Sequence, residues 1–228
     1  MPKNDVENII GELSLAFIDS SLYVLGLRDS YTSSHCANVG MISAKIAQNM
    51  GLSDEFSEEI ALAGRAHDIG KIVWPDRCFT DAKLEDLCDC KLLMAEHPTY
   101  SKAYLCKALE PLYRDKCKPR WVHWVWLHHW GYSEEFHKNP KPSDVTSQVH
   151  LDEEFELGFC ILHVADAFHA GTSVRKYRGA DPKDVRVVLD ELITGSGTNY
   201  NPEVVAQMLK MEKWLNGVCD YNNRGRVS

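Results

Sequence analysis

The residues of this chain best suited to chemistry begin with an adjacent histidine and aspartate, His67 and Asp68, followed closely by Gly70 and Lys71. Neighbouring side chains on a helix do not face the same way. They can still converge on two adjacent metal ions if the carboxylate bridges both ions and the imidazole binds one of them. The pair is a weak signal alone, and its value depends on the other ligands that the chain supplies.

Further histidines and a second aspartate could complete such a site. The candidate metal ligands, all imidazole or carboxylate groups, are His35, His67, Asp68, His97, His128, His129 and Asp166. These donors suit iron, manganese, zinc, nickel or cobalt. A bridging carboxylate suits two ions ~3.5–4 Å apart, the spacing used in two-metal hydrolysis of phosphate esters. A hydroxide that bridges the ions is then a nucleophile already deprotonated at neutral pH.

Each candidate ligand also has an ordinary structural explanation. A lone histidine such as His35 or His97 is more often a surface or capping residue than a ligand. Asp166 is harder to explain in this way, because it lies in a largely apolar stretch and a buried carboxylate needs a partner or a metal ion. The structural explanation weakens because five separate segments would all have to match by accident.

The bulk composition excludes several classes of protein. The chain has 228 residues, 44% of them hydrophobic and 25% charged, which is a soluble globular composition. Its net charge of −8 argues against a nucleic-acid polymer as partner, since such proteins usually present a basic face. The apolar runs are short and broken by charge, so no membrane span is predicted, and the N-terminus lacks the build of a signal peptide. We therefore expect a cytoplasmic protein.

The chain has eight cysteines, and none of them forms a CxxC pair. In a cytoplasmic protein they are expected to be reduced and mostly buried as small apolar residues. Cys88 and Cys90 could form a soft metal pair, although a gap of one residue is unusual for structural zinc.

The elements that must position the ligands are predicted to be helices almost throughout. Apolar residues at three- and four-residue spacing predict helices over 6–27, 35–50 and 157–170. Ser53 is a predicted N-cap for a helix that ends near Gly70. Further helix starts are predicted where proline follows a residue able to begin a helix, at His97-Pro98, Asp181-Pro182 and Asn201-Pro202.

The helices are predicted to form one main domain. We expect an N-terminal helix over 1–30 that packs on the core, a domain over 31–217 and a polar tail over 218–228. The last two helices are expected to end near Gly195 and Gly217. No stretch makes a convincing strand. Turn residues predict a long loop at about 130–153, which is typical of a functional or disordered segment.

Over about residues 9–210 the chain resembles the HD-GYP subfamily of HD-domain phosphohydrolases. The likeness is carried by residues 25–35, by His67-Asp-Ile-Gly-Lys71, by Glu96-His97-Pro98 with His128-His129, and by residues 164–178. The resemblance implies an all-α fold, an HD-domain helical bundle with a buried binuclear metal site. Each stretch is modest alone, and together they are highly specific.

The resemblance also implies a role for each matching position. One ion would be held by His35, His67, Asp68 and Asp166, and the other by Asp68, His97, His128 and His129, with Asp68 as the bridge. Lys71 would contact the scissile phosphate or protonate the leaving oxygen, and Arg175 and Arg178 would grip phosphate. Tyr31 stands where some members have a glutamate for a third metal ion, so two divalent ions are expected. Iron or manganese is favoured, and zinc, nickel, cobalt and magnesium are compatible.

The chain departs from the family in the segment after the double histidine. The family has an acidic residue and then Gly-Tyr-Pro, whereas His129 is followed by Trp130-Gly131-Tyr132-Ser133. Asn38 also replaces an arginine that is common in the family. That loop borders the substrate in the family, so the metal chemistry can be intact while recognition of the substrate differs.

The activity implied by the resemblance is hydrolysis of cyclic di-GMP to pGpG, to GMP or to both, through a metal-bridging hydroxide. Two alternatives stay open, a phosphohydrolase for another cyclic dinucleotide or a nucleotide, and a non-catalytic domain that senses a nucleotide or docks a partner. Regulation would come from a homodimer or a regulatory protein partner.

Several polar and aromatic residues close to the ligands in sequence have two interpretations. His163 and His169 lie three residues before and after Asp166, so they share a helix face with it and could hydrogen-bond a ligand. A satisfied core histidine is the simpler interpretation. Four tryptophans could stack a base near His128, although core packing is expected for at least two of them: Trp121, Trp124, Trp126 and Trp130.

Overall fold

The computed structural model describes residues 3–79, 88–113, 119–133, 142–174 and 181–224. These residues are mainly helical, and they also include an isolated β-bridge between Ser196 and Tyr200. The first α-helices are α1 Lys3–Gly26, α2 Ser30–Asn49, α3 Asp54–Ala66, α4 Cys88–Ala108 and α5 Arg120–Leu127. They are followed by α6 Pro142–Thr146, α7 Glu153–Thr172, α8 Val185–Thr194, α9 Pro202–Lys210 and α10 Glu212–Arg224. The predicted all-α bundle is confirmed in these residues.

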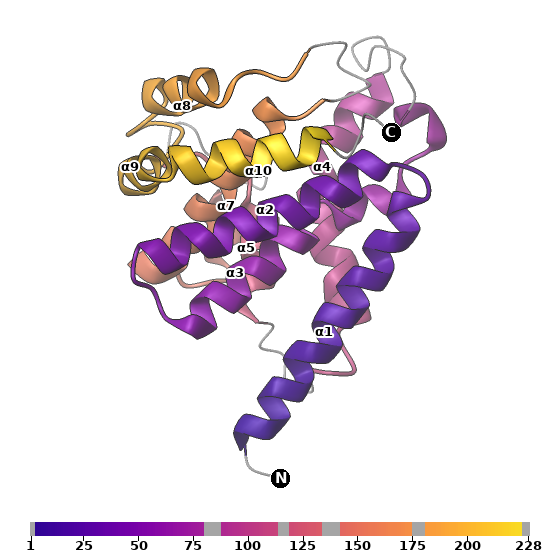
Figure 1. Ribbon diagram of the computed structural model, residues 1–228. Coiled ribbons are helices and arrows are strands. Elements are labelled where there is room, and N and C mark those ends of the chain that lie inside the picture. The colour runs from indigo at the N-terminus through magenta and orange to yellow at the C-terminus, as the bar shows by residue number, and fades with distance from the viewer. Residues whose placement is uncertain (1–2, 80–87, 114–118, 134–141, 175–180, 225–228) are drawn as a thin grey trace.

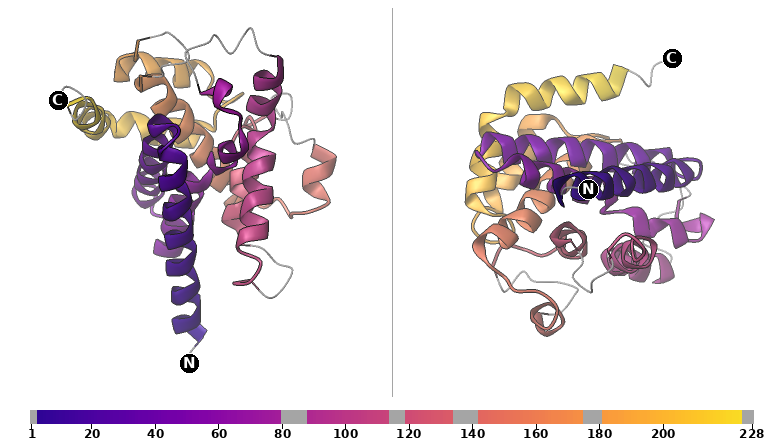
Figure 2. Two further views of the ribbon diagram at one scale, coloured as in Figure 1. Left: turned by 90° about the vertical axis from the view of Figure 1, so that its right-hand side faces the viewer. Right: turned by 90° about the horizontal axis from the view of Figure 1, so that it is seen from below.

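The core lies where α2, α3, α5 and α7 pack against one another, with α4 beside α5 (Figure 1). Helices α8, α9 and α10 form a group that packs on α7 and α2. Helix α1 packs on α2 and α3 along its C-terminal half, and its N-terminal end extends beyond the other helices in Figure 1 and in the left view of Figure 2. The central helices are the ones that carry the candidate ligands.

Helices α2 and α3 begin at side-chain caps. Asp29 accepts hydrogen bonds from the backbone N–H groups of Tyr31 and Thr32, both at 3.2 Å, so α2 begins earlier than the predicted 35. Ser53 accepts from Phe56 N–H at 3.1 Å, which confirms the predicted cap. The predicted end of α3 near Gly70 is wrong. The helix ends at Ala66, and the chain turns into a short 3₁₀ helix, η1 Ile69–Val73.

Glycines bring α2 and α3 into direct backbone contact. A Cβ added to Gly64 would lie 2.5 Å from Gly40 Cα and 2.6 Å from Gly40 N, and one added to Gly40 would lie 2.7 Å from Ala61 O. Such approach is open only to residues without a Cβ, because backbone atoms cannot rotate away as a side chain can. The contact fixes how closely His35 on α2 can approach the end of α3.

The helix start predicted at His97-Pro98 is wrong, because Pro98 lies inside α4. A proline within a helix removes the N–H that would bond to the carbonyl four residues earlier, here Met94. The His97 side chain replaces that donor, since its Nδ1 lies 2.6 Å from Met94 O. The helix continues through the proline with this carbonyl satisfied.

The C-terminal helices agree with the sequence in part. Asn201 caps α9 by accepting from Glu203 N–H at 2.9 Å, and Gly195 follows the end of α8, both as predicted. The start predicted at Asp181 is wrong, because α8 begins at Val185. Gly217 does not end a helix, because α10 continues through it to Arg224. The domain boundaries at residues 30 and 217 stay predictions.

Helix α1 has two faces of different exposure. Ile18, Leu22 and Leu25 are buried against the bundle, and Arg65 Nε of α3 donates to Asp19 Oδ1 at 3.0 Å. The stretch Asn8–Gly26 is long and apolar enough to cross a bilayer by length and mean hydropathy, 1.4, while 28% of it is buried on the protein. A packed amphipathic helix passes the same test, so the absence of a membrane span stays a prediction.

The predicted loop at 130–153 contains the short helix α6, whose Val145 is fully buried. Before it, Tyr132 N–H donates to Asn199 O at 3.1 Å and Ser133 N–H donates to Thr198 O at 2.8 Å. The segment after His129 is therefore anchored to the turn between α8 and α9. Residues 134–141 lie outside the described residues.

The expectation of reduced cysteines is wrong for one pair, because Cys78 and Cys90 form a disulfide. Cys78 ends the short 3₁₀ helix η2 Asp76–Cys78, and Cys90 lies in the first turn of α4. Both are buried beside Trp74. This pairing also excludes the soft metal pair proposed for Cys88 and Cys90. Free thiols remain at Cys36, Cys106, Cys160 and Cys219 among the described residues.

Candidate metal centre

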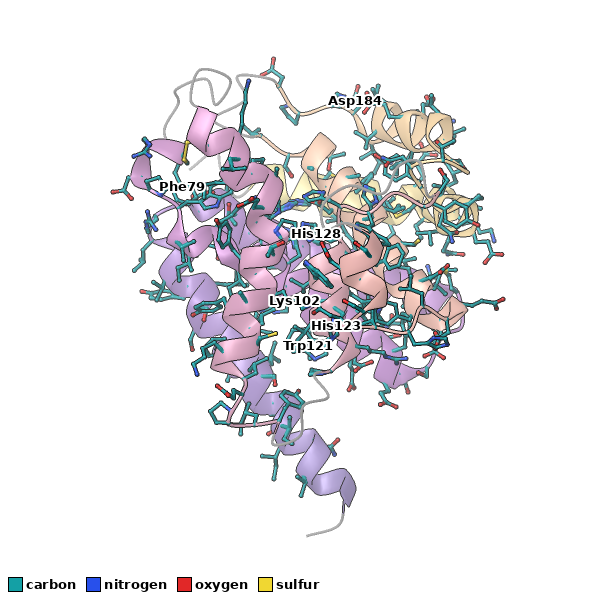
Figure 3. The ribbon with its side chains drawn as sticks, turned by 180° about the vertical axis from the view of Figure 1, so that it is seen from behind. Phe79, Lys102, Trp121, His123, His128 and Asp184 are labelled. Atoms are coloured by element: carbon teal, nitrogen blue, oxygen red, sulfur yellow. A yellow bond between two sulfur atoms is a disulfide. The ribbon has the colours of Figure 1, made fainter. Side chains whose placement is uncertain are left out.

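All seven candidate ligands meet in the interior, although they come from five elements. His35 lies in α2, His97 in α4 and Asp166 in α7, while the two remaining pairs follow directly after α3 and α5. His129 is partly buried, and the other six are buried, with exposed fractions of 8% or less. His128 lies between the helices near the middle of the molecule (Figure 3).

One group of donors consists of His35, His67 and Asp166. His35 Nε2 lies 3.0 Å from Asp166 Oδ1 and 3.2 Å from His67 Nε2. His67 Nε2 lies 3.7 Å from Asp166 Oδ1. Three donor atoms from α2, the end of α3 and α7 therefore face a common point.

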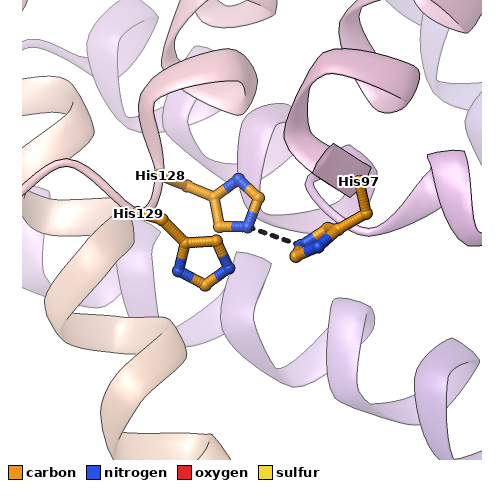
Figure 4. A group of neighbouring side chains, drawn as sticks. All are labelled: His97, His128 and His129. Atoms are coloured by element: carbon orange, nitrogen blue, oxygen red, sulfur yellow. Dashed lines mark hydrogen bonds between the residues drawn. The ribbon is translucent and has the colours of Figure 1, made fainter. Parts of the chain in front are cut away.

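A second group consists of His97, His128 and His129 (Figure 4). His97 Nε2 lies 3.1 Å from His128 Nε2. The ring centroid of His129 lies 4.1 Å from that of His128 and 5.0 Å from that of His97. The three imidazoles point toward one another from α4 and from the end of α5.

Asp68 lies between the two groups with one oxygen facing each. Its Oδ1 is 2.9 Å from His97 Nε2 in the second group. Its Oδ2 is 3.5 Å from His67 Nε2 and 3.8 Å from His35 Nε2 in the first group. This is the placement that a bridging carboxylate requires.

Backbone carbonyls set the orientation of three of the histidines. Nδ1 contacts the carbonyl three residues earlier in His67 (Gly64 O, 2.8 Å), His97 (Met94 O, 2.6 Å) and His128 (Val125 O, 2.7 Å). Gly64 and Val125 lie in the last turns of their helices, where carbonyls have no intrahelical partner. The Met94 carbonyl is freed by Pro98. Each Nδ1 must donate its proton to the carbonyl, so each ring, in the neutral form that binds a metal ion, directs the lone pair of Nε2 into the site.

This proton arrangement tests whether the residues fit a metal ion. The facing Nε2 atoms of His97 and His128 both carry lone pairs, which repel each other at 3.1 Å unless a cation lies among them. Asp68 Oδ1 is buried without a hydrogen-bond donor among the described residues, because the atom 2.9 Å away is the same unprotonated Nε2 of His97. Imidazole and carboxylate groups are also the donors that divalent transition metals bind. The buried clusters therefore suggest a metal site, and the residues fit it.

The pKa shifts follow from burial and from the mutual charges. Burial lowers the pKa of His35 to about 4, and burial together with His97 lowers that of His129 to about 3. Burial raises the pKa of Asp68, but Lys71 and His67 outweigh it and hold that pKa well below the ordinary value. Burial lowers the pKa of His67, but the charge of Asp68 outweighs it and holds that pKa well above its ordinary value. Neutral imidazoles and ionised carboxylates are the forms that bind metal ions, so a metal ion that binds His67 Nε2 must displace a proton there.

Lys71 is buried beside the bridging carboxylate. Its Nζ donates to Asp68 Oδ2 at 2.5 Å and lies 5.4 Å from the centroid of the Trp74 ring. The turn that carries it is held against α4, because Gly70 N–H donates to Ser101 Oγ at 2.9 Å and Ser101 Oγ donates to His67 O at 2.7 Å. A Cβ on Gly70 would collide with the backbone N of Ser101 and with His97 O. The glycine of the His-Asp-Ile-Gly-Lys segment is therefore required by this close approach.

Three further residues lie close to the ligands. The sequence predicted no role for one of them, Cys36, and left two interpretations open for His163 and His169. Cys36 of α2 is buried and lies with His67 and Asp68 in a third group of potential donor atoms. His169 contacts His35, whereas His163 Nδ1 donates to Trp130 O at 2.6 Å. The sequence indicated both histidines by their positions, three residues before and three residues after Asp166. Arg175 and Arg178 lie outside the described residues.

The four tryptophans near His128 are core residues, with exposed fractions of 1% for Trp121, 0% for Trp124, 5% for Trp126 and 1% for Trp130. The ring centroids of Trp124 and Phe56 lie 4.9 Å apart, and Trp124 Nε1 donates to Phe155 O at 2.9 Å. Core packing is confirmed for all four, and stacking on a base is excluded by their burial in this structure.

Comparison with protein families gives a match to the HD domain over residues 32–171. A protein of Thermotoga maritima named cyclic di-GMP phosphodiesterase is 30% identical over 197 residues, covering 84% of this chain and 47% of the relative. The cyclic di-GMP phosphodiesterase response regulator RpfG of Xanthomonas campestris pv. campestris is 26% identical over 193 residues, covering 84% of this chain and 46% of the relative. The chain thus spans about half the length of these curated relatives.

The fold is similar to that of the HD domain of the L. monocytogenes phosphodiesterase PgpH, which confirms the predicted HD-domain bundle. The match covers 87% of this chain and 98% of the PgpH chain, with a TM-score of 0.60 and 14% sequence identity. A second structure of the same domain, in complex with cyclic-di-AMP, gives a TM-score of 0.56 at 14% identity, covering 87% of this chain and 96% of its own.

Proposed function

We propose, since this chain belongs to the HD-domain family, that it is a metal-dependent phosphodiesterase that hydrolyses cyclic di-GMP to pGpG, to GMP or to both. Two lines support the proposal. The curated relatives are named cyclic di-GMP phosphodiesterases. The site presents donors for two metal ions in a buried position, and this chemistry suits phosphate esters.

The placement of Asp68 carries the proposal. Its two oxygens face two separate groups of nitrogen and carboxylate donors, at 2.9 Å from His97 Nε2 and 3.5 Å from His67 Nε2. A single structural ion would require one group only. We propose that His35, His67, Asp166 and Asp68 hold one divalent ion and that His97, His128, His129 and Asp68 hold the other.

Iron or manganese is the favoured metal on the basis of the resemblance to the HD-GYP subfamily. The imidazole and carboxylate donors also suit zinc, nickel and cobalt, and magnesium is a further candidate. When bound, the two ions would activate water and neutralise charge that develops on the phosphate.

Lys71 acts on the substrate in this proposal. Its ammonium lies beside the bridging carboxylate, so it can bind a phosphate oxygen or donate a proton to the leaving oxygen. Burial on Trp74 keeps the side chain within the site. For Arg175 and Arg178, the proposed grip on phosphate rests on the resemblance alone.

The test is metal analysis combined with turnover. Protein prepared anaerobically with iron or manganese is expected to bind about two ions per chain and to hydrolyse cyclic di-GMP. Asp68→Asn, which keeps the shape of the side chain, is expected to lose metal and turnover together. Lys71→Met is expected to keep both ions and lose turnover. Protein with two ions and no hydrolysis of any cyclic dinucleotide would contradict the proposal, and tight nucleotide binding without turnover would favour the sensing alternative.

Cyclic di-AMP is the second candidate substrate. The PgpH domain of similar fold was solved in complex with cyclic-di-AMP, and the segment after His129 departs from the Gly-Tyr-Pro pattern. A competition between the two cyclic dinucleotides at equal concentration decides between them, because the ratio of their kcat/KM values measures specificity directly.

A further inference from the structure

We infer that His169 is a positioning residue for His35, and that it fixes which nitrogen of His35 faces the metal centre. The inference rests on the proposed metal site. The two rings meet deep in the protein, with His35 Nδ1 and His169 Nδ1 2.8 Å apart and exposed fractions of 2% and 4%.

His35 needs such a partner because of its place in the fold. His67, His97 and His128 each contact a backbone carbonyl that a helix end or a proline has freed. His35 lies inside α2, where the carbonyls of the preceding turn accept from the amides of the helix itself. An acceptor for its Nδ1 proton must therefore come from another element, and α7 provides it.

The positions of the protons follow in sequence. His35 Nε2 faces Asp166 Oδ1 at 3.0 Å and His67 Nε2 at 3.2 Å, so its lone pair must lie there when a metal ion is bound. Nδ1 of His35 then carries the proton and donates it to Nδ1 of His169. A neutral His169 then carries its own proton on Nε2. Ser173 Oγ, one helical turn further along the chain, contacts both nitrogens of this ring, at 3.2 Å from Nε2 and 3.3 Å from Nδ1.

Helix α7 thus has two functions at the first metal position. Asp166 supplies a ligand atom, and His169, three residues later on the same face, orients a second ligand that belongs to α2. If His169 only filled the core, any side chain of similar shape could replace it, whether or not it had an acceptor for the Nδ1 proton of His35. This difference separates the positioning role from a packing role.

The test compares His169→Asn with His169→Leu. The two side chains have similar shape, but asparagine can place its Oδ1 where Nδ1 of histidine accepts, and leucine has no acceptor. Metal content is measured by elemental analysis and affinity by competition with a chelator, using zinc or manganese as the probe. His169→Leu is expected to weaken binding of the first ion about 10- to 100-fold, the usual effect of removing such a partner. His169→Asn is expected to restore most of the affinity.

Two controls keep the result interpretable. His150→Ala removes an exposed histidine of the loop and should leave affinity unchanged. If His169→Leu does not fold, Ser173→Ala decides, because it removes the hydroxyl that contacts both ring nitrogens of His169 and so helps to hold the ring against His35. It should give a smaller loss of affinity, which Ser173→Thr restores.

Equal affinities for the leucine and asparagine variants, whether both are weakened or both are unchanged, would overturn the inference. So would unchanged affinity in Ser173→Ala if that variant has to decide. The metal readout is independent of turnover, so a protein that shows the predicted pattern of affinities without hydrolysing any cyclic dinucleotide would refute the proposed function and leave this inference intact.

Discussion

Replacing Gly64 by alanine tests how closely α2 and α3 must approach for the first metal position to form. The added Cβ would lie 2.5 Å from Gly40 Cα, 2.6 Å from Gly40 N and 2.9 Å from Val39 C, and all three are backbone atoms. Ordinary van der Waals contacts of a Cβ atom begin at a distance of 3.4 Å. The helices must therefore separate by about 0.9 Å at this point, because no side chain can rotate to make room.

The expected loss of stability is the difference between two effects. Overpacking a core costs about 1–3 kcal/mol, and the upper part of the range applies here because only backbone atoms are in contact. Replacing glycine by alanine within a helix recovers about 1 kcal/mol. A net loss of about 2 kcal/mol corresponds to a fall in Tm of about 4–8 °C for a chain of this size.

The separation should also weaken metal binding. His67 follows directly after α3 and contacts Gly64 O through Nδ1 at 2.8 Å, so it moves with that helix and away from His35. Ligand distances in metal sites hold to about 0.2 Å, which is well below the expected displacement. Metal affinity should therefore fall even at temperatures where the variant is fully folded.

Gly11→Ala is the matched control, because a Cβ at Gly11 in α1 would have nothing within 4 Å. It should gain about 1 kcal/mol, or about 2–4 °C in Tm, with unchanged metal affinity. Thermal unfolding by circular dichroism and chelator competition measure the two quantities. If Gly64→Ala raises Tm as the control does, or lowers it without loss of metal affinity, the argument from close helix contact is wrong.

Three further predictions concern the ligands and the cysteines. Asp68→Asn should abolish the metal-dependent rise in Tm, because the bridge is lost, and the rise is measured by adding metal to the chelated protein. Reduction of the Cys78–Cys90 disulfide should destabilise the protein by about 3 kcal/mol, the usual value for a loop of this length; Cys78→Ser should show the same loss in urea unfolding and no further loss on reduction, while Cys106→Ser should stay sensitive to reduction. Burial raises the pKa of Cys160 to about 12, so its thiolate forms only as the pH approaches that value. A thiol reagent at pH 8 should label Cys106, which is partly exposed, well before Cys160, and mass spectrometry of the labelled peptides would show the reverse order if the burial argument failed.

The chemistry of the site could be predicted from the sequence because donor type and local spacing are properties of the chain itself. Adjacent residues such as His67-Asp68 stay adjacent in any fold, and Asp166 in an apolar helix carries its own signal of a buried partner. Helix caps such as Ser53 and Asn201 were also predictable, since a cap acts on the next few residues of the same chain.

The structure corrected predictions in which local rules compete with packing. Pro98 favours a helix start when considered alone, but the contacts of α4 and the bond from His97 to Met94 O carry the helix through it. Gly217 favours a helix end, yet α10 continues through it. Local preferences amount to about 1 kcal/mol for glycine and ~3 kcal/mol for proline, and tertiary contacts can exceed both.

The sequence by itself determined which side chains could bind metal ions. Only the tertiary structure decided how they act together: which oxygen of Asp68 faces which group, which carbonyl orients each imidazole, that His169 supports His35, and that Cys78 pairs with Cys90. The physical reason is that a side chain's direction depends on where its helix ends and on what packs against it. These relations join residues as far apart as His35 and His169, and no local pattern in the chain specifies them.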